Sequence, residues 1–147
     1  MIDKKDVMIL KELKKDGRLS AQEISKKTGI ATTTVFNRIR RMEKAGVIKG
    51  YAVVTDEGKI GRNIAAYVSI TVDYNLLKRK KITQQALAAE LKQHEFVDEV
   101  DMITGTSDIV VKLRTMDVSQ LSDFVTKYLR NLDGVEKTQT SVVLENF

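Results

Sequence analysis

The stretch SAQEISKKTGIATTTVFNRIRRMEKAGVIKGY, residues 20–51, decides how the chain is interpreted. It predicts two short helices around a glycine turn, followed by a β-prone run. Ser20 and Glu23 have the spacing of a capping box, in which each side chain satisfies a backbone N–H at a helix start. Gly29 lacks a Cβ and suits the sharp turn, after which the second helix begins near Thr32. This layout is typical of a helix-turn-helix, whose second helix lies in the major groove of DNA.

The two faces of the helix that begins near Thr32 differ in character. At about 100° per residue, Val35, Ile39 and Met42 fall on one side and should pack on the preceding helices. On the other side, Asn can pair with adenine, Arg with guanine, and Thr can bond to a base or touch a thymine methyl group. A merely solvated polar face is the alternative, and the clustered arginines argue against it. We expect base contacts from Thr33, Thr34 and Asn37, with Arg38 as a further candidate, and phosphate contacts from Arg40, Arg41 and Thr32.

The positive charge of the chain is concentrated in its N-terminal third. Residues 1–50 contain 13 Lys and Arg against 6 Asp and Glu, a net +7, whereas residues 51–147 contain 12 against 14, a net −2. A further helix is predicted over residues 3–16 from the spacing of Val7, Leu10 and Leu13. Because phosphate contacts supply most of the non-specific affinity for DNA, the DNA-binding face is expected in this part of the chain.

The composition excludes several classes of protein and site. The chain has 147 residues, 42% of them hydrophobic, which is enough for a buried core in one ordinary domain or two small ones. No apolar run approaches the roughly 20 residues of a membrane span, and a chain without cysteine forms no disulfide or Cys-based zinc site. The single histidine, His94, is expected on the surface late in a helix. We therefore expect a cytoplasmic protein that is not an enzyme and has no metal or other cofactor.

A linker is predicted between the two halves of the chain. Residues 50–55 are β-prone and suit a hairpin hinge or strand pairing between subunits, whereas residues 56–61 are polar and contain glycine, as loops do. We predict a helix-turn-helix domain over residues 1–50, a β linker over 51–62 and a second domain over 63–147.

The second half alternates between strand and helix signals. Residues 64–72 alternate between apolar and polar side chains, as a strand with one buried face does, and Asp117 precedes an amphipathic stripe that ends before Gly134. The order βαββαβ predicts an α+β, ferredoxin-like domain with both helices on one face of a four-stranded antiparallel sheet. The uncovered face, expected to carry Tyr67 and apolar residues of the third strand, predicts a homo-oligomer. The elements are expected at residues 64–72, 83–94, 97–104, 108–114, 117–132 and 135–145.

Together these features resemble the Lrp/AsnC family, the leucine-responsive or feast/famine regulators, over nearly the whole chain. The resemblance rests on LSAQEISKKTGIATTTVFNRIRRMEKAGVIKGY at 19–51, TGTSDIVVKL at 104–113 and LDGVEKTQTSVVLE at 132–145. It implies a helix-turn-helix (winged-helix-like) domain, a β linker and a ferredoxin-like effector domain. It also implies homodimers that assemble into octamers or similar rings and bind a small effector, usually an amino acid, between dimers.

The resemblance places the effector site at a Gly-x-x-Asp turn. The donors of such a turn can hold a carboxylate and its Asp an ammonium group, whereas the alternative is an ordinary hairpin turn. The implied residues are Gly105, Thr106, Ser107 and Asp108, with Thr140 and Ser141 of the last strand as weaker candidates.

Two positions depart from the family pattern. Ala31 stands where serine is frequent, so the cap of the recognition helix is expected to shift to Thr32. Residues 75–82 are longer and more basic than usual and include the run Lys78 to Lys81. This run is expected in a loop, where contact with the DNA backbone competes with simple solvation as its role.

The sequence predicts a sequence-specific transcriptional regulator that binds double-stranded DNA and whose assembly or DNA affinity responds to a small effector such as an amino acid. The alternative is an architectural protein that wraps DNA without an effector. An effector that shifts operator affinity would favour the regulator, and uniform affinity for all sequences would favour the architectural protein.

Overall fold

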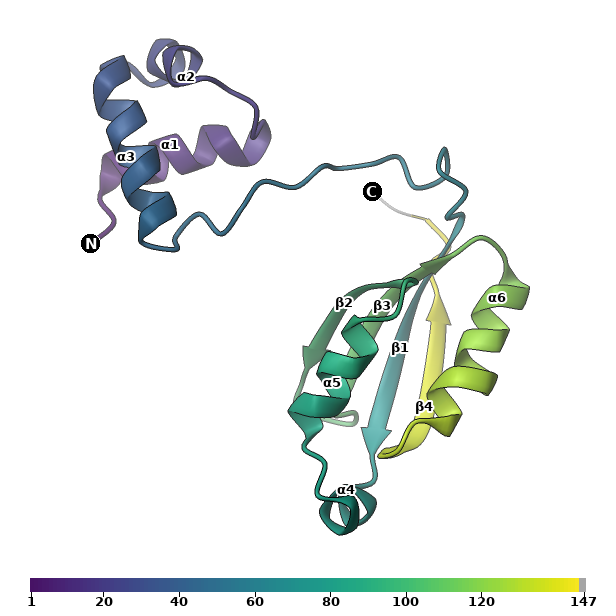
Figure 1. The fold of residues 1–147 in the computed structure, drawn as a ribbon. Coiled ribbons are helices and arrows are strands. Elements are labelled where there is room, and N and C mark those ends of the chain that lie inside the picture. The colour runs from purple at the N-terminus through teal and green to yellow at the C-terminus, as the bar shows by residue number, and fades with distance from the viewer. Residues whose placement is uncertain (146–147) are drawn as a thin grey trace. The chain divides into compact units, whose positions relative to one another are not determined.

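The computed structural model describes residues 1–145, and the chain divides between Val54 and Thr55 into two compact units. The N-terminal unit is helical, and the C-terminal unit combines a sheet with helices (Figure 1). None of the helices in the described residues is long and apolar enough to cross a membrane.

Three helices form the N-terminal unit: α1 (Lys4–Lys15), α2 (Ala21–Thr28) and α3 (Thr32–Lys44). Each contributes to one small core, with Ile9 from α1, Ile24 from α2, and Val35 and Met42 from α3 buried together. The predicted capping box at the start of α2 is confirmed, and Gly29 has a φ of 72°, a value that favours glycine. These local signals set the ends of α2 and the turn that leads into α3.

A cluster of charged side chains joins α1 to α3. The Asp6 side chain is 0% exposed, and its two oxygens accept from Arg38 Nη1 at 2.9 Å and Arg41 Nη2 at 2.6 Å. Arg38 Nη1 also lies 2.6 Å from Asp3 Oδ2, and this bond lowers the pKa of Asp3 to about 2. Burial by itself raises the pKa of Asp6, but the Asp3 backbone N–H and the two guanidinium groups outweigh burial and lower it. The buried carboxylate is therefore ionised and paired.

No strand occurs in the described chain over residues 45–63, which follow α3. The predicted β linker is thus not a strand within one chain, because an extended segment needs a partner for its backbone groups. Val53 and Val54 are almost fully exposed. Pairing of this segment with a second subunit stays a prediction.

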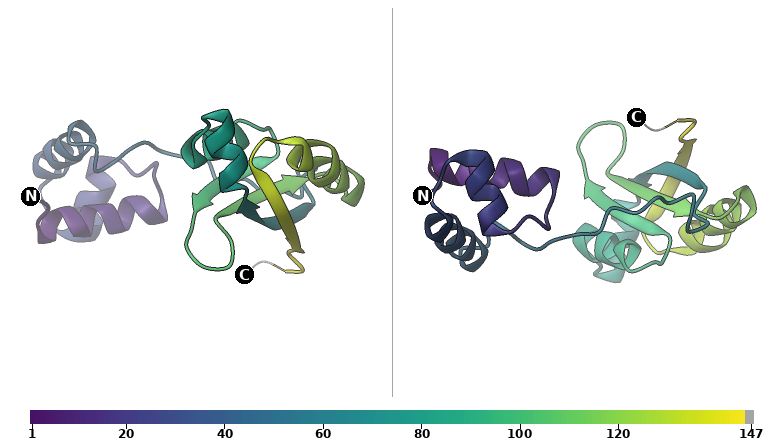
Figure 2. Two further views of the ribbon diagram at one scale, coloured as in Figure 1. Left: turned by 90° about the horizontal axis from the view of Figure 1, so that it is seen from below. Right: turned by 90° about the horizontal axis from the view of Figure 1, so that it is seen from above.

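The C-terminal unit is a four-stranded antiparallel sheet in the order β2-β3-β1-β4. Helices α5 and α6 lie on one face of it (Figures 1 and 2), which confirms the predicted ferredoxin-like arrangement. The strands are β1 (Ile64–Val72), β2 (Val97–Met102), β3 (Ile109–Thr115) and β4 (Val135–Val142), and the helices are α4 (Tyr74–Lys80), α5 (Gln84–Lys92) and α6 (Val118–Asp123).

The open face of the sheet is more polar than the sequence predicted. Tyr67 is 42% exposed there and pairs with Lys112 of β3. Side chains alternate along a strand, so β3 presents Val110, Lys112 and Arg114 to this face while its other residues are buried with the helices. The third strand therefore contributes one apolar side chain, not an apolar surface.

Helix α4 corrects the prediction of a basic loop. The side chain of Asp73 accepts from Leu76 N at 2.8 Å and caps the helix, and Leu77 is buried. A Cβ at Gly134 would lie 2.4 Å from Leu77 Cδ2, and the φ of Gly134 is 98°, so only glycine fits under this helix. A cap and one buried leucine thus turn residues 74–80, which include most of the basic run, into a docked helix.

The region after α6 and the position of His94 also differ from the predictions. The chain continues beyond α6 as a π turn over Phe124–Tyr128, in which residues five apart share a face, so that Phe124 and Leu129 are both buried. His94 lies beyond α5 and packs against Phe124 and Tyr128 with ring centroids 4.7 and 4.5 Å apart. This partial burial lowers the pKa of His94 and replaces the expected surface position.

We predict that Asp6→Asn lowers the free energy of unfolding of the helical unit by about 3 kcal/mol, because it leaves Arg38 and Arg41 without their buried partner. The depressed pKa values of Asp3 and Asp6 stabilise the wild type fully above about pH 4, and this contribution is lost as the pH falls to about 2. Urea denaturation followed by circular dichroism between about pH 5 and 2 measures both effects. Asp16→Asn, which removes an exposed carboxylate just after α1, is the matched control, and equal losses in the two variants would contradict the prediction.

Candidate functional site

Helix α3 presents a row of exposed side chains on the side opposite the core. Phe36 is 49% exposed, and the guanidinium carbon of Arg40 lies 4.9 Å from the centroid of its ring. No contact was assigned to Phe36 from the sequence, although an aromatic residue outside the apolar stripe is itself a signal. The row consists of Thr33, Phe36, Asn37, Arg40 and Lys44, with Thr34 half-buried at its edge.

Within residues 1–145, no side chain caps the first turn of α3. Ala31 is the N-cap residue and its carbonyl accepts from Val35 N at 3.0 Å, so Thr32 is already helical and the expected shift of the cap does not occur. The other α-helices of residues 1–145 each have a side-chain cap. Unpaired N–H groups at a helix N-terminus attract anions such as phosphate.

Two of the arginines predicted to contact DNA form ion pairs inside the N-terminal unit. The Arg38 guanidinium is turned to Asp3 and Asp6 on α1, which withdraws it from the base contact considered above. Arg41 also binds Asp6, but its side chain stays 53% exposed and can still reach a phosphate. The acidic partners lie more than 30 positions away in the sequence, so the pattern of α3 alone could not reveal them.

A hollow of ≈ 260 Å³ lies on the open face of the sheet, beside the loop between β2 and β3. Ser69 and Thr71 reach it from β1, and Lys137 reaches it from β4. Lys137 forms no ion pair with any residue between 1 and 145. Hydroxyl groups with one unpaired cation suit a carboxylate. The full lining is Ser69, Thr71, Thr106, Ser107, Lys137, Thr138 and Gln139.

The loop places part of the predicted effector set at this hollow. Thr106 and Ser107 line it, and Gly105, with a φ of 131°, shapes the same loop. The Asp108 carboxylate instead accepts from Val72 N at 2.8 Å and from the Tyr74 hydroxyl at 2.8 Å. Asp108 therefore closes the end of β1, and its bond to Tyr74 raises the pKa of that phenol.

The two candidates on β4 lie on opposite faces of the sheet. Thr140 pairs with Val68, a core residue, and so shares the helix-covered face. Ser141 pairs with Tyr67 on the open face, two residues beyond Gln139. Strand alternation thus separates neighbours that the sequence had grouped, and the sequence had not singled out Lys137.

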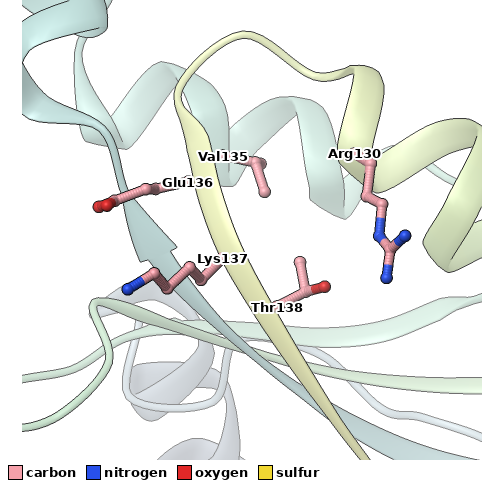
Figure 3. Close-up of a pocket in the computed structure, with 5 residues that line it drawn as sticks. All are labelled: Arg130, Val135, Glu136, Lys137 and Thr138. Atoms are coloured by element: carbon pink, nitrogen blue, oxygen red, sulfur yellow. The ribbon is translucent and has the colours of Figure 1, made fainter.

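A second hollow, of ≈ 540 Å³, lies at the start of β4. Figure 3 shows Arg130 reaching toward it from the turn before the strand, while Lys137 projects from the other side of β4. Val135, Glu136 and Thr138 complete its lining. None of the predicted site residues lies here.

Family models match both units. The model for winged helix-turn-helix DNA-binding domains matches residues 2–49, and the model for the Lrp/AsnC ligand binding domain matches residues 65–147, more than half of the chain. The chain belongs to the Lrp/AsnC family. It is therefore a DNA-binding transcriptional regulator with a ligand-binding domain, in a family whose members are not enzymes.

Individual members of the family are similar to this chain along nearly their whole length. The chain is 35% identical over 145 residues to the HTH-type transcriptional regulator FL11 of Pyrococcus furiosus, covering 99% of this chain and 91% of FL11. It is 33% identical over 144 residues to the leucine-responsive regulatory protein of Salmonella typhimurium, covering 98% of this chain and 85% of that protein. A transcriptional regulator of Neisseria meningitidis in complex with L-Met shares 25% identity and a TM-score of 0.88, with 99% and 91% covered. AsnC of E. coli shares 25% identity and a TM-score of 0.82, with 99% and 94% covered.

We predict that Ala31→Ser stabilises this Lrp/AsnC protein by about 1 kcal/mol, because a serine hydroxyl would accept from an N–H group of the first turn of α3. Urea denaturation measures the gain. Ala31→Val, which cannot cap, is the control, and a serine variant no more stable than the valine variant would show that the first turn already has a partner.

Proposed function

We propose that this regulator reads DNA sequence through the exposed row of α3 and that a small effector, an amino acid, bound on the open face of the sheet modulates its assembly or DNA affinity in the cytoplasm. The observation that carries the proposal is the polar row itself. It lies on a helix whose other side is locked in a core, so its side chains are presented rigidly to a partner. In a unit with a net charge of +7 over residues 1–50, that partner is DNA.

The residues of α3 divide by chemistry. Thr33, Thr34 and Asn37 lie in the first half of the helix, the part that reaches base edges in helix-turn-helix proteins. Phe36 adds an apolar contact of the kind made with thymine methyl groups. Arg40, Arg41 and the uncapped first turn at Thr32 serve the phosphates.

We predict that Asn37→Ala weakens binding to a duplex selected by this protein from a random pool by about 1–3 kcal/mol and relaxes base preference. Arg40→Ala should weaken binding to all duplexes and reduce the slope of log K against log salt by about 1. Fluorescence anisotropy with selected and scrambled duplexes measures both. If the two variants lower both affinities by the same factor, the division into base and phosphate contacts is wrong.

The effector is proposed to bind in the hollow beside the loop between β2 and β3. Lys137 and the hydroxyls of Thr106 and Ser107 would hold its carboxylate, and Asp108 would act mainly by holding the loop in place. Two observations support an amino acid as the class: Lys137, which has no ion-pair partner within residues 1–145, lies in the hollow among hydroxyls, and the similar Neisseria meningitidis protein was solved with L-Met.

We predict that calorimetry with the twenty amino acids finds a binder, and that Lys137→Gln weakens it at least tenfold while DNA binding without effector is retained. Arg130→Gln is the control for lost charge near the start of β4. By linkage, DNA should change effector affinity by the same factor as effector changes DNA affinity, typically about 5–150-fold. If none of the twenty amino acids gives a heat of binding, an architectural protein is favoured. If Lys137→Gln binds the amino acid as tightly as the wild type does, the site lies elsewhere.

Assembly is proposed to follow the family pattern of homodimers joined into octamers or similar rings. The open face carries both Tyr67 and the hollow, so an effector there can change how subunits pack. The proposed domains are 1–50, a linker over 51–62 and 63–147. A two-fold dimer requires a nearly palindromic site with half-site centres about 10 base pairs apart, or a multiple of that.

A further inference from the structure

The cations of the C-terminal unit fall into two groups. Most of them bind a neighbouring acceptor: Lys59 lies 3.2 Å from Asp56, Lys127 lies 2.8 Å from Asp123, and Lys92 donates to the Asp98 carbonyl. Within residues 55–145, the cations without an ion pair or such an acceptor are Lys78, Arg79, Lys81, Arg130 and Lys137.

These five cations gather at one end of the sheet, where β1 ends and β4 begins. Figure 1 shows α4 at this end, and Asp73 N donates to the Gly134 carbonyl at 2.8 Å. Lys80 of α4 lies 2.6 Å from Asp133, three positions after Arg130. The second half of the chain has a net charge of −2, so this concentration of unpaired positive charge is local.

The cations of α4 are held on a rigid support. Leu77 is buried against Gly134, and Asp73 caps the helix, so the basic end of α4 is docked to the domain. Lys78 and Arg79 are exposed in its last turn, and Lys81 follows with a φ of 56°. One or two cations would complement the helix dipole. Four cations in succession repel one another, and a helix end that faces only solvent gains no stability from them.

The chemistry of this surface favours a phosphate backbone over a protein partner. Protein interfaces are enriched in aromatic residues and arginine at their centre and depleted in lysine. Lys78 and Lys81 are lysines, and phosphate contacts to DNA need positive charge without shape complementarity. DNA is already the ligand of this regulator.

We propose that Lys78, Arg79 and Lys81, with Arg130 beside them, form a second contact with DNA phosphates, separate from α3. The contact is independent of sequence. A duplex gains from this contact only if it is long enough to touch both α3 and these cations. Each phosphate neutralised adds about 0.9 to the salt slope of binding, so three cations contribute about 2–3.

The test compares two triple variants of the full chain with equal loss of charge. Lys78→Gln/Arg79→Gln/Lys81→Gln removes the proposed contact, and Lys59→Gln/Lys92→Gln/Lys127→Gln removes cations that already have acceptors. The affinity of each variant is measured at several salt concentrations on two duplexes. One is a selected operator of about 20 base pairs. The other holds the same operator within about 100 base pairs, which is below the persistence length of about 150 base pairs. We expect the α4 variant to lose about 2–3 in salt slope on the long duplex, and the control variant to lose none.

Three outcomes would overturn the proposal. The two variants can behave alike, which would attribute the effect to net charge. The α4 variant can keep the wild-type salt slope on both duplexes, which would show that these cations contact no phosphate. Sedimentation can show that the α4 variant forms an assembly of different size while its salt slope is unchanged, which would assign these cations to an interface between copies of the chain.

Discussion

The DNA-binding unit depends on the burial of one carboxylate. Asp6 is fully buried, so its charge must be compensated, and the two arginines that do this lie one turn apart on α3. Both point to α1, so they hold α3 in the same rotation in which Val35 and Met42 are buried. That rotation presents Asn37 and Arg40 on the outer side. Ion pairs inside the unit thus contribute to which side chains of α3 face outward.

In the C-terminal unit, strand alternation divides the same segments between stability and the proposed effector site. On β1, Ile70 and Val72 enter the core with the helices, whereas Ser69 and Thr71 border the hollow on the open face. The core can therefore remain unchanged while the polar side varies. Asp108 links the two roles, since it closes the end of β1 and holds the loop that carries Thr106 and Ser107.

Local chemistry made much of the fold predictable. The capping box at Ser20, the turn at Gly29 and the cap at Asp117 act within a few residues, so their signals are complete in the sequence. The alternation over β1 is equally local. Helix α4 escaped prediction because its support is Leu77 packed on Gly134, a contact between residues far apart in the chain.

The sequence by itself determined the order of elements, the βαββαβ arrangement, the recognition helix and the family, since these rest on periodicity, caps and contiguous motifs. Only the tertiary structure decided which polar side chains are available. Arg38 lies on the recognition helix but is bound to Asp3 and Asp6, Asp108 turns from the hollow to Val72 and Tyr74, and Lys137 enters the hollow instead. A side chain's partner is chosen by proximity in space, and sequence patterns carry no record of distances between distant segments.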